Sequence, residues 1–276
     1  MSRRRRRKKP IIPRKIMLIN ADHPSEVRVA ALADGILDEL YIERADGGRI
    51  TGNIYKASVT NVDKALQAAF VDIGFGKNGF LHASDVIPPN GGYQGILKKP
   101  RIRRPPGSQG RKLNVEEMLR NGQEVLVQVA REGLGHKGPS LTTYISIPGR
   151  YLVLMPALGK VGVSKKIEDQ ALRRQLRERM KAFSVPKELG IIVRTVASTA
   201  TDDEIRTDLN YLKRLWTDIR KQVRSTGPPA LLYKESDLVT RALRETLTAD
   251  TDLVVVDSEA AYAPVSYTHL RAHETV

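Results

Sequence analysis

Two adjacent residues, Arg194 and Thr195, have the chemistry to hold a phosphate group. Arginine offers a planar fork of donors with a permanent positive charge, and threonine adds a hydroxyl donor. They lie near the end of a strand-like run, 190–196, that leads into a loop. Neighbouring side chains on a regular strand point to opposite faces, so both can meet one phosphate only if the backbone bends there. A surface ion pair is the alternative role for this arginine.

Acidic residues gather in two places, around the apolar run 253–256 and directly after Thr201. The two groups are Asp250, Asp252, Asp257 and Glu259, and Asp202, Asp203 and Glu204. We interpret the first group as solvated loop and strand-end residues and the second as the first turn of a helix, where carboxylates favour the helix dipole. Neither group therefore predicts a catalytic metal centre. Cysteine is absent, which excludes disulfides and thiolate metal sites and is typical of a cytoplasmic protein.

Positive charge is concentrated in two short segments flanked by proline and glycine. Residues 1–15 hold nine lysines and arginines and residues 98–112 hold seven, without an acid in either, against a net charge of +15 for the whole chain. The rest of the chain is therefore nearly neutral. Such dense runs are typical of segments that bind nucleic-acid phosphates, although a solvated tail is the alternative. We expect residues 1–13 to be disordered.

The first half of the chain has the alternating apolar pattern of short strands. Asp34-Gly35 favours a tight hairpin between two of the first three runs. The expected strands near the start are 15–20, 27–33 and 36–43, and those that follow are 50–59, 66–73, 79–82, 125–131 and 141–145. Five short strands with one long loop, 86–114, predict a small Greek-key barrel of the OB-fold type.

After residue 148 the pattern changes to mixed α/β. Apolar residues recur at helical spacing between Ile167 and Phe183, and Thr201 with Glu204 forms a capping box that opens a second helix. Gly227-Pro228-Pro229 ends that helix, and Ser236 is the expected cap of a third. Strands are expected at 151–155, 190–196 and 253–256.

Eight short blocks, in order along the chain, resemble the amino-terminal part of the ribonuclease E/G family. They are Met17-Leu18-Ile19-Asn20-Ala21, Asn53-Ile54-Tyr55-Lys56, Ala68-Ala69-Phe70-Val71-Asp72-Ile73-Gly74, Gly79-Phe80-Leu81-His82, Lys137-Gly138-Pro139-Ser140-Leu141-Thr142-Thr143, Tyr151-Leu152-Val153-Leu154-Met155-Pro156, Ser164-Lys165-Lys166-Ile167-Glu168 and Gly190-Ile191-Ile192-Val193-Arg194-Thr195. The resemblance covers roughly residues 14–265.

The resemblance implies an α+β protein of several modules. An S1-type OB-fold RNA-binding domain at 49–147 would be inserted in an RNase H-like scaffold made of 14–48 and 239–265. Residues 148–238 would form a subdomain that senses a 5′-monophosphate on RNA. Residues 266–276 resemble translated vector sequence, so we give the spacing of His269 and His273 no weight as a metal site.

The resemblance also assigns RNA-binding residues in the barrel. Phe70 and Phe80 fall at the family's base-stacking positions, Lys137 falls on its phosphate-side lysine, and His82 is a further contact. An OB-fold needs aromatic faces for bases and cations for phosphates. Because Leu81 follows Phe80, alternation places one of the two inward, and we expect Phe80 to face outward. A core role for one of the two phenylalanines is the alternative.

In the sensor, the resemblance assigns the 5′-phosphate to Arg194 and Thr195. Gly149 and Val153 correspond to positions that meet the terminal base. Lys165 and Lys166 stand where relatives usually carry two arginines. A positive charge remains at both positions, but the bidentate fork is lost.

The family's cleavage centre is not expected in this chain. In the full-length family, a DNase I-like domain binds Mg²⁺ through aspartates, a Cys-Pro-x-Cys zinc link pairs subunits, and the proteins form homo-oligomers. We therefore predict single-stranded and 5′-monophosphorylated RNA as partners, no catalytic or metal-binding residue here, and no cleavage by this chain alone. The alternative is a freestanding, non-catalytic RNA-binding or ribosome-associated protein. No apolar run approaches the roughly 18 residues that a membrane helix needs.

Overall fold

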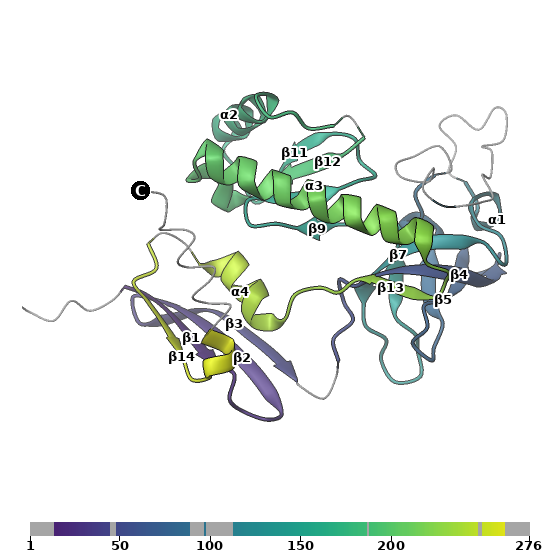
Figure 1. The fold of residues 1–276 in the computed structure, drawn as a ribbon, viewed down its shortest axis with the longest axis horizontal. Coiled ribbons are helices and arrows are strands. Elements are labelled where there is room, and N and C mark those ends of the chain that lie inside the picture. The colour runs from purple at the N-terminus through teal and green to yellow at the C-terminus, as the bar shows by residue number, and fades with distance from the viewer. Residues whose placement is uncertain are drawn as a thin grey trace, which may run out of the picture. The chain divides into compact units, whose positions relative to one another are not determined.

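The computed structural model describes residues 14–44, 48–88, 97, 113–186, 188–247 and 250–262. Most of the first basic segment, all of the second and the unusual end of the chain lie outside these residues. The chain divides into two compact units (Figure 1). One is Arg49–Glu235, and the other combines Met1–Gly48 with Ser236–Val276. The proposed border at residue 147 falls inside the first of these units and stays an interpretation.

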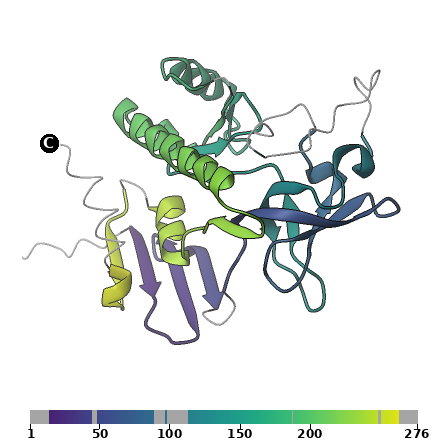
Figure 2. The ribbon, with the colours of Figure 1, turned by 45° about the vertical axis from the view of Figure 1, so that its right-hand side comes forward.

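The two-segment unit is built on one four-stranded sheet in the order β14-β1-β2-β3 (Figure 2). Its elements are β1 Lys15–Asn20, β2 Glu26–Ala33, β3 Ile36–Arg44, α4 Leu238–Thr246 and β14 Leu253–Val256. The hairpin between β2 and β3 turns at Asp34 and Gly35, whose φ angles are 50° and 79°. The two positive φ angles fit the tight hairpin turn that this residue pair favours. β14 runs parallel to β1, so residues more than 230 positions apart share one sheet.

Helix α4 supplies the core of this unit by packing on one face of the sheet. The buried residues are Met17, Ile19, Val29, Leu238, Val239, Ala242, Leu243 and Leu247. The cap of α4 is Asp237, whose carboxylate accepts the N–H of Thr240 at 2.8 Å. The expectation of Ser236 as the cap was therefore wrong by one residue. A carboxylate at this position satisfies a free N–H and also favours the helix dipole.

Residues 54–142 form a closed five-stranded barrel of the S1 type. Its strands are β4 Ile54–Asp63, β5 Ala68–Asp72, β6 Gly79–His82, β7 Glu124–Arg131 and β8 Ser140–Thr142, with η2 Ala83–Asp85 and α1 Val115–Met118 between them. The barrel closes because β4 pairs with both β5 and β7. A distant strand, β13 Ala230–Tyr233, also pairs with β4. The sheet of the barrel therefore gains one further strand from residues 230–233, which follow the α/β region in the sequence.

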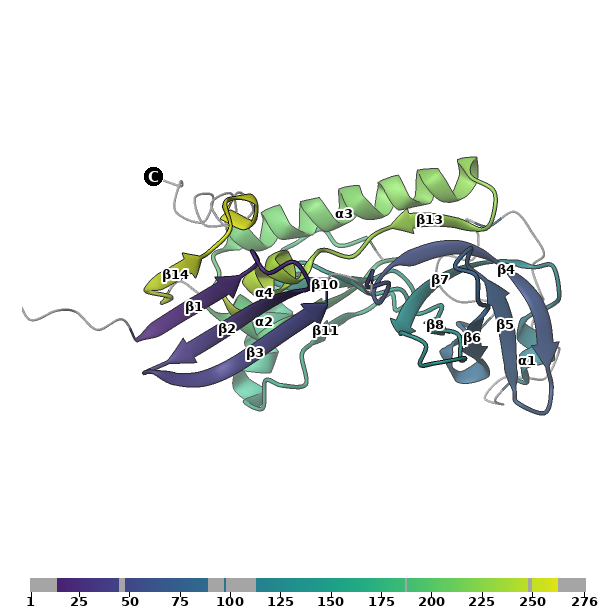
Figure 3. The ribbon, with the colours of Figure 1, turned by 90° about the horizontal axis from the view of Figure 1, so that it is seen from below.

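The α/β region is a four-stranded sheet in the order β11-β12-β10-β9 with helices packed against it (Figure 3). Its elements are β9 Ile147–Pro148, β10 Leu152–Met155, β11 Val161–Val163, α2 Gln170–Lys181, β12 Gly190–Val193, η4 Thr195–Ser198 and α3 Asp202–Ser225. The capping box at Thr201 and Glu204 is present. One stripe of α3 is buried, formed by Ile205, Leu209, Leu212, Trp216, Ile219 and Val223. These stripes of apolar residues form the core, as their spacing predicts.

The structure differs from the expected pattern in its shortest elements. β12 ends at Val193 instead of Val196, because the chain turns into η4 there. Three strands of two to four residues, β9, β11 and β13, did not stand out in the sequence. Such short strands carry too few alternating positions to give a signal, and distant partners hold them.

Candidate nucleic-acid interface

Three aromatic side chains form a row on the outer surface of the barrel. Phe70 lies on β5, and Phe80 and His82 lie on β6, where the register pairs Phe70 with Phe80. All three are partly exposed, whereas Leu81 between them is completely buried. Leu81 thus occupies the inward position that alternation leaves for it, and both phenylalanines lie on the same outward face.

The rings in this row lie close enough to act together. The centroids of Phe70 and Phe80 are 6.1 Å apart with an angle of 72° between the planes. Those of Phe80 and His82 are 6.5 Å apart with an angle of 27°. The imidazole of His82 is held by the Ser84 hydroxyl at 2.8 Å from Nδ1. Such a row offers consecutive π faces, on which the bases of a single strand can stack without regard to sequence.

The loop that carries Lys137 runs beside the start of β6. The main-chain N–H of Phe80 donates to the carbonyl of Pro139 at 2.7 Å, and Lys77 Nζ donates to the carbonyl of Gly135 at 2.7 Å. The approach is so close that a Cβ on Gly138 would lie 1.9 Å from the carbonyl oxygen of Asn78. Lys137 itself is exposed. The structure therefore brings one lysine to each side of this loop contact, next to the strand that carries Phe80.

A second group of polar residues meets at one edge of the α/β sheet. β11 is parallel to β12, with Val163 opposite Val193, and β10 is antiparallel to β12, with Leu152 also opposite Val193. Residues after β11 and β12 therefore meet residues before β10. These residues are Ser164, Lys165 and Lys166, Arg194 and Thr195, and Gly149, Arg150 and Tyr151. Three separate segments thus converge at the edge.

The backbone bends at the pair that the sequence singled out. Arg194 caps the 3-10 helix η4, which begins at Thr195, so these two residues do not continue the strand. The Arg194 guanidinium donates from Nη1 to the carbonyl of Gly149 at 2.9 Å, and the main-chain N–H of Arg194 donates to the carbonyl of Tyr151 at 2.9 Å. Val153 lies one register position further in, opposite Ile192. The bend that a shared phosphate requires is present.

Asp208 on α3 holds the loop that faces Arg194. Its carboxylate accepts the main-chain N–H groups of Arg150, Tyr151 and Leu152 at 3.1, 2.8 and 2.9 Å. A Cβ on Gly149 would lie 2.5 Å from Oδ1 of Asp208, so the loop approaches this closely only with glycine there. Burial raises the pKa of Asp208, although these N–H donors and the charge of Arg194 oppose the shift.

Asp208 was not predicted as a site residue, although its position in the sequence indicates a special role. Position 208 lies three residues after Ile205 and four before Leu212, within the apolar stripe of α3. A carboxylate in such a stripe needs hydrogen-bond donors from the protein, because burial without them is costly. A polar interruption of an otherwise regular stripe therefore indicates a residue that organises its neighbours.

A second contact from α3 fixes the same loop. The Tyr151 hydroxyl donates to Glu204 at 2.7 Å, and the Arg150 guanidinium lies 5.5 Å from the centre of the Tyr151 ring. Burial and the hydrogen bond to Glu204 raise the pKa of Tyr151 to about 12. The phenol therefore stays neutral at physiological pH and remains a donor.

Lys165 and Lys166 lie exposed in the turn after β11. Within the described residues, neither side chain makes an ion pair or a hydrogen bond. The turn is held by Arg173, whose Nη1 donates to the carbonyls of Ser164 and Ile167 at 2.7 and 2.9 Å. Arg173, which was not predicted as a site residue, thus holds the turn that places the two lysines at the edge of the sheet. Each lysine carries its charge on a single ammonium group.

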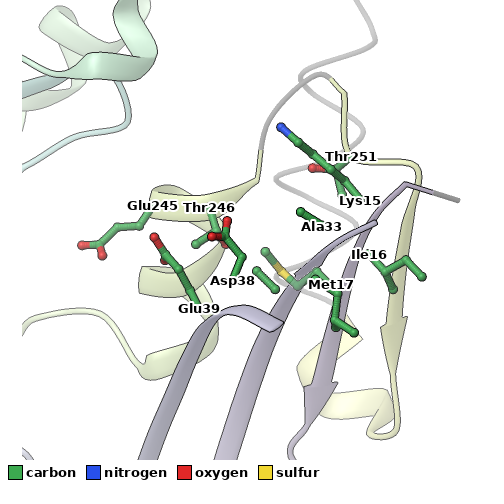
Figure 4. A pocket seen from close by; sticks show the side chains of 11 residues that line it. Lys15, Ile16, Met17, Ala33, Asp38, Glu39, Glu245, Thr246 and Thr251 are labelled. Carbon is green, nitrogen blue, oxygen red and sulfur yellow. The ribbon is translucent and has the colours of Figure 1, made fainter. Parts of the chain in front are cut away.

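The two-segment unit contains a pocket with acidic side chains at its rim (Figure 4). Asp38 and Glu39 of β3 and Glu245 of α4 line it together with Lys15 of β1. Among the described residues, no three acidic or imidazole side chains are grouped so that they could hold a metal ion.

The acids around β14 are hydrogen-bonded to the main chain of β1. Asp252 accepts the N–H groups of Arg14 and Lys15 at 2.7 and 2.9 Å, and Asp257 accepts that of Ala21 at 2.7 Å. Our interpretation of these aspartates as merely solvated was therefore incomplete. They fasten the two ends of β1 to the segments that flank β14.

Known proteins resemble this chain along most of its length. A family model described as the S1 RNA binding domain matches residues 50–143, and one described as the ribonuclease E/G family matches residues 146–274. Ribonuclease G of Escherichia coli K12 is 40% identical over 246 residues, which are 89% of this chain. The chain belongs to the ribonuclease E/G family. Within the family it is also 37% identical to ribonuclease G of Haemophilus influenzae over 243 residues.

This family member spans about half the length of the ribonuclease G relatives, 48% of the Escherichia coli protein. It spans 22% of ribonuclease E from Escherichia coli K12, to which it is 35% identical over 249 residues. In the part of the chain that the structure describes, no helix combines the length and the apolar character needed to cross a membrane.

Proposed function

We propose that this chain is the RNA-binding and 5′-end-sensing part of a ribonuclease E/G-type endoribonuclease that acts in RNA processing and decay. The barrel would bind single-stranded RNA, and the edge of the α/β sheet would bind a 5′-monophosphate. Mg²⁺-dependent cleavage would belong to the part of the family's length that this chain does not cover. The convergence of Gly149, Lys165, Lys166, Arg194 and Thr195 on one sheet edge carries the proposal.

The chemistry at this edge suits a terminal phosphate better than an internal one. A terminal monophosphate carries up to two negative charges and three accessible oxygens, whereas an internal phosphodiester carries one charge. Arg194 would donate to two oxygens through its planar fork, and Thr195 would add a hydroxyl donor. Lys165 and Lys166 would contribute charge from the neighbouring turn. Val153, whose side chain is partly exposed, would offer an apolar contact to the first base, and Gly149 would meet that base through its backbone.

The bond between Arg194 and the Gly149 carbonyl orients the guanidinium. It directs the guanidinium toward the loop 149–152, which Asp208 and Glu204 hold. A preorganised fork loses less entropy when it binds a ligand. Because lysine has no planar fork, Arg194→Lys keeps the charge and removes the geometry.

The test is a competition between three RNAs that differ only at the 5′ end: hydroxyl, monophosphate and triphosphate. We expect the monophosphate to bind best, by about 1.5 kcal/mol over the hydroxyl, because a charge-assisted hydrogen bond has roughly that worth at an exposed site. Arg194→Lys should remove most of this preference and leave binding of the hydroxyl RNA unchanged.

Arg177→Lys is the matched control, since Arg177 is an exposed arginine on α2. It should keep the preference for the monophosphate. Equal binding of the monophosphate and hydroxyl RNAs by the unmodified chain would refute the sensor and leave the barrel's role to be tested separately.

A further inference from the structure

The exposed side of α3 is divided sharply by charge. Successive residues of an α-helix are rotated by about 100° around its axis. Beyond the first turn of α3, this rotation places every lysine and arginine on one side of the buried stripe. We call this the α3 basic flank, and its residues are Arg206, Lys213, Arg214, Arg220, Lys221 and Arg224. The opposite flank carries Glu204 and Asp208, which hold the sensor loop. The basic flank is therefore separate from the sensor.

Half of these cations have no ion pair or hydrogen bond with another described residue. Arg214, Arg220 and Arg224 are exposed, and their side chains make no ion pair or hydrogen bond within the described residues. The other three have weak or partial partners. Arg206 contacts Asp203 at 3.3 Å, Lys213 donates to the Ser184 carbonyl at 2.7 Å, and Lys221 contacts Asp218 at 3.0 Å.

Like charges this close together oppose helix stability. Arg220 and Arg224 are four residues apart on one face, a spacing at which equal charges are unfavourable by some tenths of a kcal/mol. This repulsion offsets part of what α3 gains from Arg224 near its C-terminus, whereas a bound polyanion would relieve it. A solvated helix face more commonly intersperses charges of both signs.

The helix is placed to extend an RNA-binding surface toward the barrel. Arg206 and Arg224 are separated by about 27 Å at 1.5 Å per residue. Figures 1 and 3 show α3 running from the α/β sheet to the strand β13. At that end, Lys56 Nζ of β4 donates to the carbonyl of Thr226 at 2.8 Å, and β13 pairs with β4. The helix is thereby joined to the S1 barrel.

We infer that the α3 basic flank is a third RNA contact, which binds backbone phosphates whatever the 5′ end carries. The choice of RNA as the polyanion rests on the proposed function. Four of the six cations are arginines, which suit phosphate oxygens. A membrane surface fits less well, because a helix that lies on lipid exposes apolar residues beside its cations. Here the positions between the cations are polar, for example Asn210 and Thr217.

The test neutralises the three unpartnered arginines together, as Arg214→Gln, Arg220→Gln and Arg224→Gln. The matched control removes the same charge from exposed cations elsewhere, as Arg44→Gln, Arg120→Gln and Lys234→Gln. Binding of a 5′-hydroxyl single strand about 30 nucleotides long is measured at several salt concentrations. We expect the flank variant to bind about tenfold more weakly and its log–log salt slope to fall by about 2, since each lost phosphate contact on a single strand contributes about 0.7.

Two further measurements separate this inference from the proposed function. The flank variant should keep the monophosphate preference, which depends on Arg194. RNA containing 4-thiouridine should crosslink to peptides from 206–224 in the unmodified chain. If the sensor is wrong, the monophosphate preference is absent while the effect of the flank variant remains. If the stacking row is wrong, replacing Phe80 by leucine does not weaken RNA binding, and the effect of the flank variant again remains.

The inference is overturned if the flank and control variants bind the long RNA equally well, or if no crosslink falls within 206–224. It is also overturned if the flank mediates binding to vesicles of anionic phospholipid and not to RNA. Circular dichroism of both variants checks that α3 remains folded. Unchanged helicity is expected, because the three arginines are exposed and make no ion pair or hydrogen bond with another described residue.

Discussion

Phe80 and Leu81 are neighbours in the sequence and have opposite surroundings. Leu81 is completely buried inside the barrel, while Phe80 is partly exposed and lies between Phe70 and His82. At the scale of single residues, the direction of a side chain thus decides between a core role and a binding role. A phenylalanine buried only on one side gains little for stability and leaves a π face available to a base.

Phe80→Leu tests this assignment without opening a cavity in the core. Leucine keeps an apolar side chain against Phe70 and removes the ring, so the barrel should remain folded. Single-stranded RNA should bind about 1–3 kcal/mol more weakly, the usual worth of one base–aromatic stack. Tyr211→Leu, at an exposed tyrosine on α3, is the control and should leave binding unchanged. Loss of soluble protein with Phe80→Leu would instead support a core role.

Helix α3 is the element that relates the different surfaces. Its buried stripe forms the core of the α/β region, its Asp208 holds the loop 149–152, and its far end joins the barrel through Lys56. Asp208 contacts no proposed ligand and acts by positioning the loop beside Arg194. Asp208 is therefore a positioning residue of helix α3 and does not itself bind the phosphate.

Asp208→Asn should separate positioning from binding. Asparagine retains the size but directs an amide NH₂ toward main-chain N–H donors, so at least one of the three hydrogen bonds is lost. We expect a loss of about 1–3 kcal/mol in the free energy of unfolding. The monophosphate preference should fall while stacking on the barrel persists. Asp218→Asn, at an exposed site on the same helix, is the control in urea denaturation and in RNA competition. An unchanged preference would show that the loop does not need this carboxylate.

The strand β1 depends on two carboxylates whose protonation can be controlled. Main-chain N–H groups of Lys15 and Arg14 hold the pKa of Asp252 below its usual value, and that of Ala21 does the same for Asp257. A lowered folded-state pKa stabilises the fold above the ordinary aspartate range of about 4, and this stabilisation is lost as the pH falls through the folded value.

We therefore expect the amides of β1 and β14 to lose protection from hydrogen exchange on acidification from pH 6 to pH 3, after correction for the intrinsic exchange rate. Asp252→Asn should weaken this pH dependence and give lower protection already at pH 6. Asp38→Asn, on β3 of the same sheet, provides the comparison. Protection that is independent of pH in the unmodified chain would contradict a role for the two aspartates.

At the scale of the whole molecule, we propose three surfaces of the described residues as RNA contacts: the aromatic row, the sheet edge and the α3 basic flank. The same residues contain no three acidic or imidazole side chains grouped to hold a metal. The relatives named ribonuclease G are about twice as long as this chain.

The purified chain should not cleave RNA, with or without Mg²⁺. Asp252 and Asp257, next to β14, accept main-chain N–H groups, which leaves them poorly placed to activate water. A gel assay with a 5′-labelled RNA checks this, with full-length ribonuclease G of Escherichia coli as the positive control. Metal-dependent cleavage that disappears in Asp252→Asn or Asp257→Asn would show that the active site lies in this chain after all.

Local pattern was sufficient for the larger elements. The Asp34-Gly35 hairpin, the capping box at Thr201 and the apolar stripe of α3 depend on interactions within a few residues, so the sequence itself determined them. The ordered family blocks likewise indicated the S1 barrel and pointed to Arg194 and Thr195. The local patterns and the family blocks both consist of residues that are close together in the sequence.

Only the tertiary structure decided how distant segments meet. Parallel pairing of β11 with β12 brings Lys165 to the edge that carries Arg194, and no local pattern encodes this register. The hydrogen bonds from residues 150–152 to Asp208 span 56 to 58 positions. Asp208 and the apolar stripe occupy the sides of α3 that pack against the protein. Only this packing determines which flank of the helix remains for the cations. These features depend on packing between elements, which sequence spacing alone does not determine.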